Sequence, residues 1–333
     1  MHGTFVLFGI DFPAYFTLLM LGFLAGIWLA WRHAAAARIN PNVILDFGML
    51  LVIGGVGGGR LAHVLFDGQL TDYYYLCVDP MQTSGELLPT AVPSKCTEDS
   101  QCVTANVGDL CNLERGTCHS ERDCLRPLKF WYGGLTYYGG FIVAIPLGLW
   151  FLRRRQVNPW KVGDMAAFAV PLGIGFGRLG CFFAGCCFGS TCDVPWGVSF
   201  PTGSPAWRTH HEGGLVLASD ASFPVHPTQL YESIGCFALA GVMLWFYHRR
   251  RQYYGQGFWL MAIAYAVMRF LIEMVRADDR GGGFGLSTSQ IISICFVVAA
   301  MGMFPYLRRL PQTDTPVPRR TQHPEETPPA PPA

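Results

Sequence analysis

The sequence predicts an all-α membrane protein with about seven transmembrane helices. Three observations carry this prediction. The chain of 333 residues is 51% hydrophobic and 14% charged. Apolar runs near the ~20 residues that cross a bilayer recur along it, and Lys and Arg concentrate in alternate connections between them. The net charge of +1 argues against a nucleic-acid-binding protein, which would show a basic surplus.

Seven apolar segments are expected to form these helices: residues 12–31, 43–66, 133–152, 163–184, 229–248, 256–275 and 288–307. The connections after the first, third, fifth and seventh segments hold basic residues: Arg32, Arg38, Arg153, Arg154, Arg155, Lys161, Arg249, Arg250, Arg251, Arg308 and Arg309. Cytoplasmic loops are enriched in Lys and Arg, so the N-terminus is predicted outside and the C-terminus in the cytoplasm. The start, MHGTFVLFGIDFPAYF, lacks the basic n-region of a cleaved signal peptide, and we expect the first helix to be retained.

Residues 67–128 are expected to form a disulfide-rich extracytoplasmic loop between the first two helices (1–66) and the other five (129–310). The loop holds six of the twelve cysteines: Cys77, Cys96, Cys102, Cys111, Cys118 and Cys124. An even number of closely spaced cysteines in polar surroundings is typical of disulfides in an oxidising compartment. A zinc module is the alternative, but the loop has no tight CxxC pair and one histidine, His119. The Pro-rich tail, 311–333, is predicted to be disordered in the cytoplasm.

Ionisable residues lie within the apolar segments, where they cost several kcal/mol unless they face a partner or a water-filled cavity. In MRFLIEMVRADDR, residues 268–280, Arg269, Glu273 and Arg276 follow an i, i+4, i+7 spacing that places them on one helix face. A glutamate between two arginines neutralises one of them, and one positive charge remains for an anionic ligand. A structural ion-pair network is the alternative.

Two glycine-rich stretches also carry arginines: GGVGGGRLAHVLF (54–66) has Arg60 and His63, and GIGFGRLGCFFAGCCFG (173–189) has Arg178. Guanidinium groups and exposed amides both favour phosphate oxygens. The alternatives are snorkelling of Arg60 to the lipid headgroups and a buried ion pair for Arg178. Several guanidinium groups in apolar surroundings suit a phospholipid headgroup and its acyl chains.

The stretch PVHPTQLYES, residues 224–233, is dense in hydrogen-bonding groups at the start of the fifth segment. One interpretation is helix capping, with Thr228 as the cap and Glu232 near the positive end of the helix dipole. That interpretation does not account for His226.

Seven stretches, in this order, resemble the bacterial prolipoprotein diacylglyceryl transferase family. They are YFTLLMLGFLAG, GGRLAHVLF, WYGGLTYYGG, GRLGCFFAGCCFG, HPTQLYE, YAVMRFLIEMVRADDR and GLSTSQIIS. The resemblance covers the membrane part from about Tyr15 to Ser293, and the cysteine-rich loop and the tail lie outside it.

The resemblance implies seven membrane helices, an outside N-terminus and a place in the bacterial inner (plasma) membrane. It implies transfer of the diacylglyceryl group of phosphatidylglycerol to the lipobox cysteine thiol, in the signal-peptide region of a preprolipoprotein, with release of glycerol-1-phosphate. It implies no metal, no cofactor and no nucleic acid.

The resemblance also implies roles for individual residues. Arg178 would contact phosphatidylglycerol and Arg269 would steady the departing phosphate, with Glu273 and Arg276 supporting that face. Tyr15, His63 and Tyr138 are expected among the catalytic residues, and the remaining substrate-binding candidates are Arg60, His226, Tyr231, Gly139 and Gly140.

The chain departs from the family at the residues that would activate the thiol. Tyr138 stands where the family usually has the histidine favoured for that role, and neutral tyrosine, with a pKa near ~10, is a poor base. His63 stands where the family commonly has tyrosine. From this reciprocal exchange we hypothesise that His63, through Tyr138, accepts the thiol proton.

A second departure lies in GRLGCFFAGCCFG, where Cys181, Ala184 and Cys186 replace the family's usual asparagine, asparagine and glutamate. We expect Cys186, Cys187 and Cys192 to form a disulfide; a metal site or simple packing are the alternatives.

Three other functions compete with the transferase. A diverged paralogue would use another acceptor or phospholipid. A non-catalytic lipid- or protein-binding membrane protein would explain the lost histidine. A transporter would require paired broken helices in matching halves, which the sequence lacks. The joint presence of five polar residues favours a catalytic function over a non-catalytic scaffold. They are Arg178, His226, Arg269, Glu273 and Arg276.

Overall fold

The computed structural model describes residues 4–7, 10–68, 70–85, 95–105, 107–129, 136–217, 219–276, 282–283 and 286–310. The chain divides into two compact units. Unit 1 comprises Met1–Asp46 and Leu152–Ala333, and unit 2 comprises Phe47–Phe151. The tail from residue 311, predicted to be disordered, lies outside the described residues.

Each of the seven expected apolar segments contains a long helix. The helices are α1 (Ala14–Ala34), α2 (Pro41–Phe66), α5 (Tyr137–Arg154), α6 (Pro159–Ala184), α8 (Thr228–Arg249), α9 (Gln256–Glu273) and α10 (Thr288–Arg309). Within the described residues, five are long and apolar enough to cross a membrane: α1 (with residues 35–37), α2, α6, α8 and α10. The other two, α5 and α9, have 18 residues each, or about 27 Å of helix.

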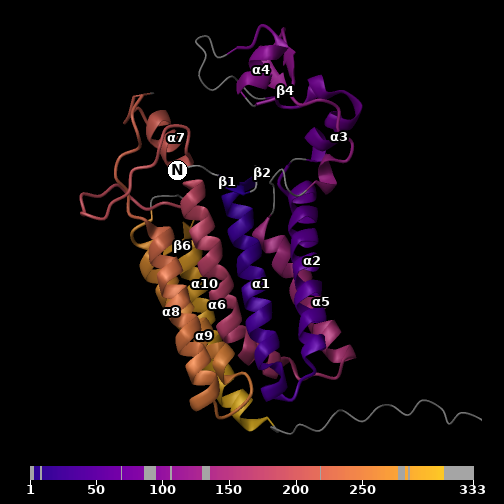
Figure 1. Ribbon diagram of the computed structural model, residues 1–333, viewed down its shortest axis with the longest axis vertical. Helices are drawn as coiled ribbons and strands as arrows, with labels where there is room; N and C mark the ends of the chain where they lie inside the picture. The colour runs from indigo at the N-terminus through magenta and orange to yellow at the C-terminus, as the bar shows by residue number, and fades with distance from the viewer. Residues whose placement is uncertain are drawn as a thin grey trace, which may run out of the picture. The chain divides into compact units, whose positions relative to one another are not determined.

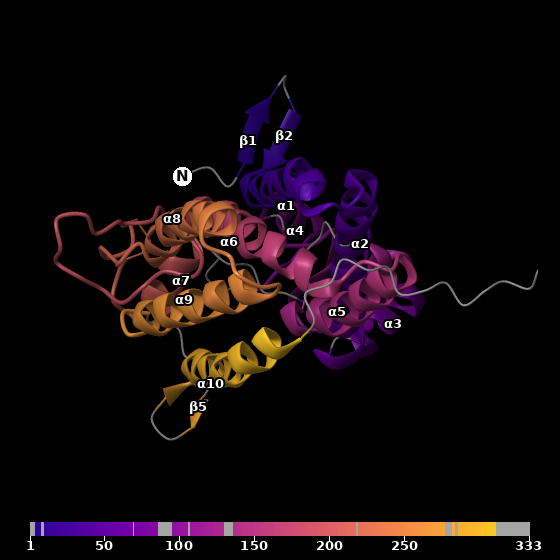
Figure 2. The same ribbon diagram turned by 90° about the horizontal axis from the view of Figure 1, so that it is seen from below.

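Helix α6 occupies the centre of unit 1, where it packs against α1, α8 and α9, while α10 packs against α9 (Figures 1 and 2). Small residues allow α1 and α6 to approach closely, as in other membrane helix pairs. A Cβ atom on Gly22 of α1 would lie 2.8 Å from the carbonyl oxygen of Gly173 on α6.

A buried carboxylate at the other end of α6 fixes the start of α9. Asp164 is fully buried and its carboxylate accepts hydrogen bonds from the amides of Gly255 (2.9 Å), Gly257 (2.8 Å) and Phe258 (3.3 Å). The first amides of a helix have no partner within the helix. A side chain of α6 therefore caps α9.

Helix α6 ends in a tight reversal just after Arg178. Gly185 has a left-handed φ of 69°, which glycine adopts without strain. The amide of Cys186 donates to the carbonyl of Cys181 at 3.2 Å, as in a Schellman motif. The chain beyond this turn makes isolated β-bridges that join Gly189 to Arg276, and Thr191 to Val225.

Short elements complete unit 1. Strands β1 (Thr4–Leu7) and β2 (Ile10–Pro13) form an antiparallel hairpin before α1, so the first helix begins two residues later than expected. Helix α7 (Pro205–Glu212) is capped by the Ser204 hydroxyl. Strands β5 (Gly282–Gly283) and β6 (Leu286–Ser287) pair before α10, which starts with a capping box of Ser287 and Gln290.

Unit 2 contains a small disulfide-linked region after α2. It comprises α3 (Leu70–Val78), η2 (Pro80–Gln82), α4 (Asp99–Ala105), β3 (Leu110–Asn112), β4 (Thr117–His119) and η3 (Arg126–Leu128). The structure pairs Cys77 with Cys124, Cys96 with Cys111, and Cys102 with Cys118. Four of these cysteines form a small buried core, against which Val107 packs. The disulfides thus replace the hydrophobic core that so short a segment cannot build.

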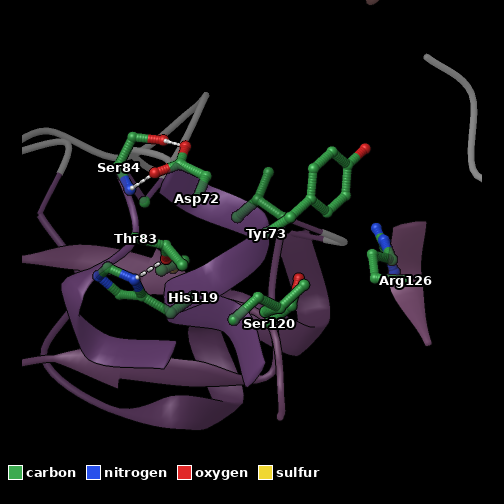
Figure 3. Close-up of a pocket in the computed structure, with 11 residues that line it drawn as sticks. Asp72, Tyr73, Thr83, Ser84, His119, Ser120 and Arg126 are labelled. Atoms are coloured by element: carbon green, nitrogen blue, oxygen red, sulfur yellow. Dashed lines mark hydrogen bonds between the residues drawn. The ribbon is translucent and has the colours of Figure 1, made fainter. Parts of the chain in front are cut away.

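The same region contains a pocket of about 210 Å³ beside α3 and β4 (Figure 3). Asp72 lies at its edge and accepts hydrogen bonds from the amide (3.3 Å) and the hydroxyl (2.5 Å) of Ser84. His119 is 2% exposed. Its Nδ1 lies 2.8 Å from the hydroxyl of Thr83, and its Nε2 lies 2.8 Å from the hydroxyl of Thr117.

Hydrogen bonding places a hydrogen on Nδ1 of His119. The Thr83 hydroxyl donates its single hydrogen to the carbonyl of Pro80 at 2.8 Å, so it accepts from Nδ1 of the ring. In the neutral ring, Nε2 is then the acceptor for the Thr117 hydroxyl. Burial also lowers the pKa of His119 below its ordinary value.

We expect acid to loosen the disulfide-linked region through this histidine. A lowered pKa in the folded state means that the unfolded region binds the proton better, so stability is full above the unfolded pKa of about 6.5 and falls as the pH drops through it. Hydrogen exchange of the β3–β4 amides at pH 7.5 and pH 5 measures the loss of protection. His119→Gln should lack this loss; an equal loss in that variant would contradict the assignment.

Helices α2 and α5 pack through glycines, so a larger side chain at their contact should destabilise the protein. A Cβ on Gly58 would lie 2.6 Å from Cβ of Val143 and 2.7 Å from the carbonyl oxygen of Gly139, whereas one on Gly57 meets nothing within 4 Å. We expect Gly58→Ala to lower the free energy of unfolding by about 1–3 kcal/mol, as overpacking does. Gly57→Ala, the matched control, should be neutral or stabilising because alanine favours helix. Unfolding by SDS titration compares the two.

Candidate functional site: a buried arginine and glutamate cluster

A fully buried glutamate joins three helices of unit 1. Glu232 of α8 is 0% exposed, and its Oε2 lies 3.0 Å from Nε of Arg178 on α6 and 3.6 Å from Nη1 of Arg269 on α9. The hydroxyl of Tyr265, also on α9, donates to Oε1 at 2.8 Å. Both carboxylate oxygens therefore face cations or donors, as a buried carboxylate requires.

A second glutamate extends the cluster. Oε2 of Glu273 lies 2.6 Å from Nη2 of Arg269 and 3.9 Å from Nε of Arg276. The expected shared face is thus observed, although α9 ends at Glu273. Arg276 lies beyond the helix and is held by its backbone bridge to Gly189. Nη2 of Arg269 also lies 3.4 Å from the hydroxyl of Ser289 on α10.

One guanidinium nitrogen of this cluster lacks a hydrogen bond. Among the described residues, the buried Nη1 of Arg269 has no hydrogen-bond acceptor, although it lies 3.6 Å from Oε2 of Glu232. A buried donor without an acceptor is costly, so the arrangement suits an anion that accepts hydrogen bonds from guanidinium groups.

Tyr15 lies near this cluster because α1 and α6 touch at their ends. A Cβ on Gly180 would lie 3.1 Å from the carbonyl oxygen and 3.2 Å from Cα of Tyr15. Gly180 is two residues from Arg178 on α6. The expected catalytic role of Tyr15 stays a prediction.

His226 and Tyr231 form a hydrogen-bonded pair in the segment before and within α8. The Tyr231 hydroxyl accepts from Nε1 of Trp196 at 2.7 Å and lies 3.2 Å from Nδ1 of His226. The backbone of His226 bonds to Ser190 (3.0 Å) and Gly189 (2.9 Å). These contacts tie His226 to the same loop that holds Arg276; its substrate-binding role stays a prediction.

The capping interpretation of PVHPTQLYES is wrong for Thr228. The N-cap of α8 is Pro227, without a side-chain cap. The Thr228 hydroxyl instead donates to the carbonyl of Cys187 at 2.8 Å, and Nε2 of Gln229 donates to the carbonyl of Cys186 at 2.7 Å. These side chains hold the turn after α6, because that turn exposes carbonyls that need donors.

The disulfide expected among the second set of cysteines is also wrong. Cys181, Cys186, Cys187 and Cys192 form no disulfide. The turn after α6 gathers three of them instead, and the sulfur atoms of Cys181, Cys186 and Cys187 all lie within 4.8 Å of one another. Cys192, expected to join Cys186 and Cys187, does not belong to this group.

The remaining candidates lie in unit 2. Arg60 donates from Nε to the carbonyl of Pro127 at 2.8 Å and from Nη2 to the carbonyl of Arg126 at 2.7 Å, and its guanidinium carbon lies 5.3 Å from the ring centroid of Tyr73. These contacts fasten η3 of the disulfide-linked region to α2. Binding of substrate by Arg60 stays a prediction.

Gly139 and Gly140 are close-packing residues. A Cβ on Gly139 would clash with Cβ of Ala62 and lie 2.6 Å from the carbonyl oxygen of Gly58, and one on Gly140 would lie 3.0 Å from the carbonyl oxygen of Gly55. Contact between α2 and α5 explains why these positions lack side chains. Their expected contact with substrate stays a prediction.

His63 is oriented by an aspartate that the sequence analysis did not consider. Nδ1 of His63 lies 2.8 Å from Oδ2 of Asp67, and the same oxygen accepts a hydrogen bond from the Thr136 hydroxyl at 2.6 Å. The Thr136 bond, followed by the His63 bond, lowers the pKa of Asp67 below its ordinary value. An ionised Asp67 holds the Nδ1 hydrogen of the ring and leaves Nε2 as the basic atom.

Tyr138 and His63 lie at neighbouring positions on two packed helices. Gly139, next to Tyr138, abuts Ala62, next to His63. Tyr138 is 59% exposed. The exchange of roles between tyrosine and histidine stays a prediction.

Glu232, Tyr265 and Asp67 are the polar residues that sequence reasoning missed as parts of a site. Glu232 lies in the stretch PVHPTQLYES, but its position in the first turns of a helix also fits an interaction with the helix dipole. Its depth in an apolar segment was the available signal, because a carboxylate there needs cationic partners. Tyr265 and Asp67 carried no comparable signal.

Comparison with known proteins places the chain. The sequence profile of the family described as "Prolipoprotein diacylglyceryl transferase" matches residues 3–85 and 117–306, and so leaves out residues 86–116 of the disulfide-linked region. Relatives named "Phosphatidylglycerol--prolipoprotein diacylglyceryl transferase" include one from Clostridium tetani, 28% identical over 90% of this chain and 95% of the relative. Another, from Pseudoalteromonas atlantica, is 32% identical over 92% and 90%.

A third relative with the same name, from Vibrio vulnificus, is 34% identical over 87% of this chain and 84% of its own length. The profile spans α6, α8 and α9, the helices that carry the arginine and glutamate cluster. This chain belongs to the prolipoprotein diacylglyceryl transferase family.

Proposed function

We propose that this protein transfers the diacylglyceryl group of phosphatidylglycerol to the lipobox cysteine thiol of preprolipoproteins and releases glycerol-1-phosphate. The relatives carry the name of this activity. The single observation that carries the proposal to this chain is the buried cluster of Arg178, Arg269, Arg276, Glu232 and Glu273, in which Nη1 of Arg269 has no hydrogen-bond acceptor among the described residues.

The cluster has the chemistry that the leaving group needs. The thiolate sulfur attacks the glyceryl carbon, the carbon–oxygen bond to phosphate breaks, and negative charge develops on glycerol-1-phosphate. Fixed guanidinium groups in a low-dielectric site stabilise such charge. Arg178 would bind the phosphate of the lipid, and Arg269, with a buried Nη1 and a side chain held by both glutamates, would stabilise it as it departs.

We further propose a seven-helix topology in the bacterial inner membrane, with the N-terminus outside. Basic residues in the last turns of α1, α5, α8 and α10 support it: Arg32, Arg153, Arg154, Arg249, Arg308 and Arg309. The three disulfides fit an extracytoplasmic position for the loop of residues 67–128, because the cytosol keeps thiols reduced.

Rescue of cells depleted of their own transferase tests the function. The wild-type protein should restore growth and thioether-linked lipid on a reporter lipoprotein, as measured by mass spectrometry. Arg269→Gln should lower transfer by about 10²–10³-fold, the usual loss for one donor to a developing oxyanion. Arg155→Gln is the matched control, because Arg155 makes an exposed ion pair with Asp46 at 3.1 Å and such pairs contribute little.

Good membrane expression without lipid transfer would favour the paralogue or the binding protein. Equal activity of Arg269→Gln and Arg155→Gln would remove the arginine cluster from the reaction.

The thiol must lose its proton before it reacts, since thiolate is the nucleophile. We propose His63, oriented by Asp67, as the acceptor of that proton. His63→Gln and Asp67→Asn should each lower transfer, His63→Gln by about 10²–10⁴-fold, as loss of a general base does. The Asp67 variant should also shift the pH–rate profile, a readout that a packing defect would not move. Near-normal transfer by His63→Gln would end this hypothesis.

A further inference from the structure

The turn after α6 presents three thiols as one set. Cys181 lies in the last turn of α6, and Cys186 and Cys187 follow its glycine cap. The three sulfur atoms lie within 4.8 Å of one another. Three sulfurs at about 2.3 Å from one zinc ion in a tetrahedral site stand about 3.8 Å apart. Side-chain rotations that shift the sulfur atoms by about 1 Å would therefore allow all three to bind one ion.

The backbone that carries these thiols is held in a strained conformation. Cys187 has a φ of 63°, a left-handed value that is uncommon outside glycine. Thr228 fixes the carbonyl of Cys187 at 2.8 Å, and Gln229 fixes the carbonyl of Cys186 at 2.7 Å. Strain maintained by neighbouring side chains is concentrated at functional sites. The convergence of the three sulfurs is thus imposed by α8.

The donor set selects the metal. All three donors are sulfur, which favours Zn²⁺ over the oxygen-seeking Mg²⁺ and Ca²⁺. Among the described residues, no fourth His, Cys, Asp or Glu belongs to the group. Three protein ligands with an open fourth position are the pattern of reactive zinc sites, whereas structural sites are closed.

The group lies beside the arginine cluster. Arg178 precedes Cys181 by three residues on α6, a spacing that places two side chains on the same helix face. A zinc ion with three thiolates carries a net charge of −1, and Arg178 supplies a positive charge next to it. An acceptor thiol bound at the open position would stand next to the arginine proposed to bind the lipid phosphate.

We propose that Cys181, Cys186 and Cys187 bind a zinc ion whose fourth ligand is the sulfur of the acceptor cysteine. This inference rests on the proposed function and addresses thiol activation, for which the chain lacks the family's usual histidine at Tyr138. A thiol that coordinates zinc is deprotonated. The proton passes through water to a base. The zinc-bound sulfur then forms its bond to the glyceryl carbon as the phosphate oxygen leaves with the electron pair.

Metal analysis of the full-length protein in detergent tests the site. Zinc measured by mass spectrometry should amount to about one ion per chain in the wild type and in Cys295→Ser, a control at an exposed thiol of α10. Cys181→Ser, Cys186→Ser and Cys187→Ser should each weaken zinc binding by at least about tenfold, since even outer-shell changes cost that much. Serine is nearly isosteric, and circular dichroism checks the fold of each variant.

Cobalt(II) substitution of the wild type tests the open position and needs no variant. A site with three thiolates gives intense visible absorption, and a peptide with a lipobox cysteine should change that spectrum, whereas the same peptide with serine should not. Three results would each overturn the inference. They are less than a tenth of a zinc ion per chain, a disulfide within the group, and a cobalt spectrum that does not change when the cysteine peptide is added.

A lipid-transfer assay on the same samples separates the two proposals. Transfer by wild-type protein that binds no zinc would overturn the metal site and leave the proposed function intact. A cobalt spectrum that responds to the cysteine peptide, in a protein that transfers no lipid, would support the metal site and overturn the transferase.

Discussion

A desolvated carboxylate is the constraint on which unit 1 depends. Glu232 is removed from water within an apolar helix, where an unpaired charge would cost several kcal/mol or more. Arg178 and Arg269 must therefore stay within reach of it, and their helices must stay beside α8. The same contacts that make the buried charge tolerable also set the positions of two guanidinium groups. The pairing that stabilises the buried carboxylate thus also positions the arginines to which the proposed function assigns the lipid phosphate.

The loop after α6 packs closely against two other segments of unit 1. Gly189 lies where a Cβ atom would be 2.6 Å from the carbonyl oxygen of Val275 and 2.7 Å from Cβ of His226. The backbone of three separate segments can meet there only because that residue is glycine. Their hydrogen bonds hold the backbone at Arg276, which is outside any helix. A loop residue is thereby added to a polar site that is otherwise carried by helices.

Sequence patterns predicted the helices well, because hydropathy over ~20 residues has few competing explanations. The spacing of Arg269, Glu273 and Arg276 also predicted their contacts. The patterns failed for features that depend on contacts between residues far apart in the sequence. Thr228 looked like a helix cap but bonds to Cys187, 41 residues earlier. The six cysteines of the loop allow 15 pairings, so spacing alone could not select the observed three.

The Asp164 carboxylate holds α9 at the end opposite to the arginine cluster. Helix α9 is clamped at its first turn by that carboxylate and near its last turn by Glu232 and Glu273, so it cannot tilt or slide without breaking charged contacts at one end. The hydroxyl of Ser289 on α10 accepts a hydrogen bond from Nη2 of Arg269 at 3.4 Å. Because both ends of α9 are anchored, a ligand that pairs with Arg269 meets a donor whose position is set in advance.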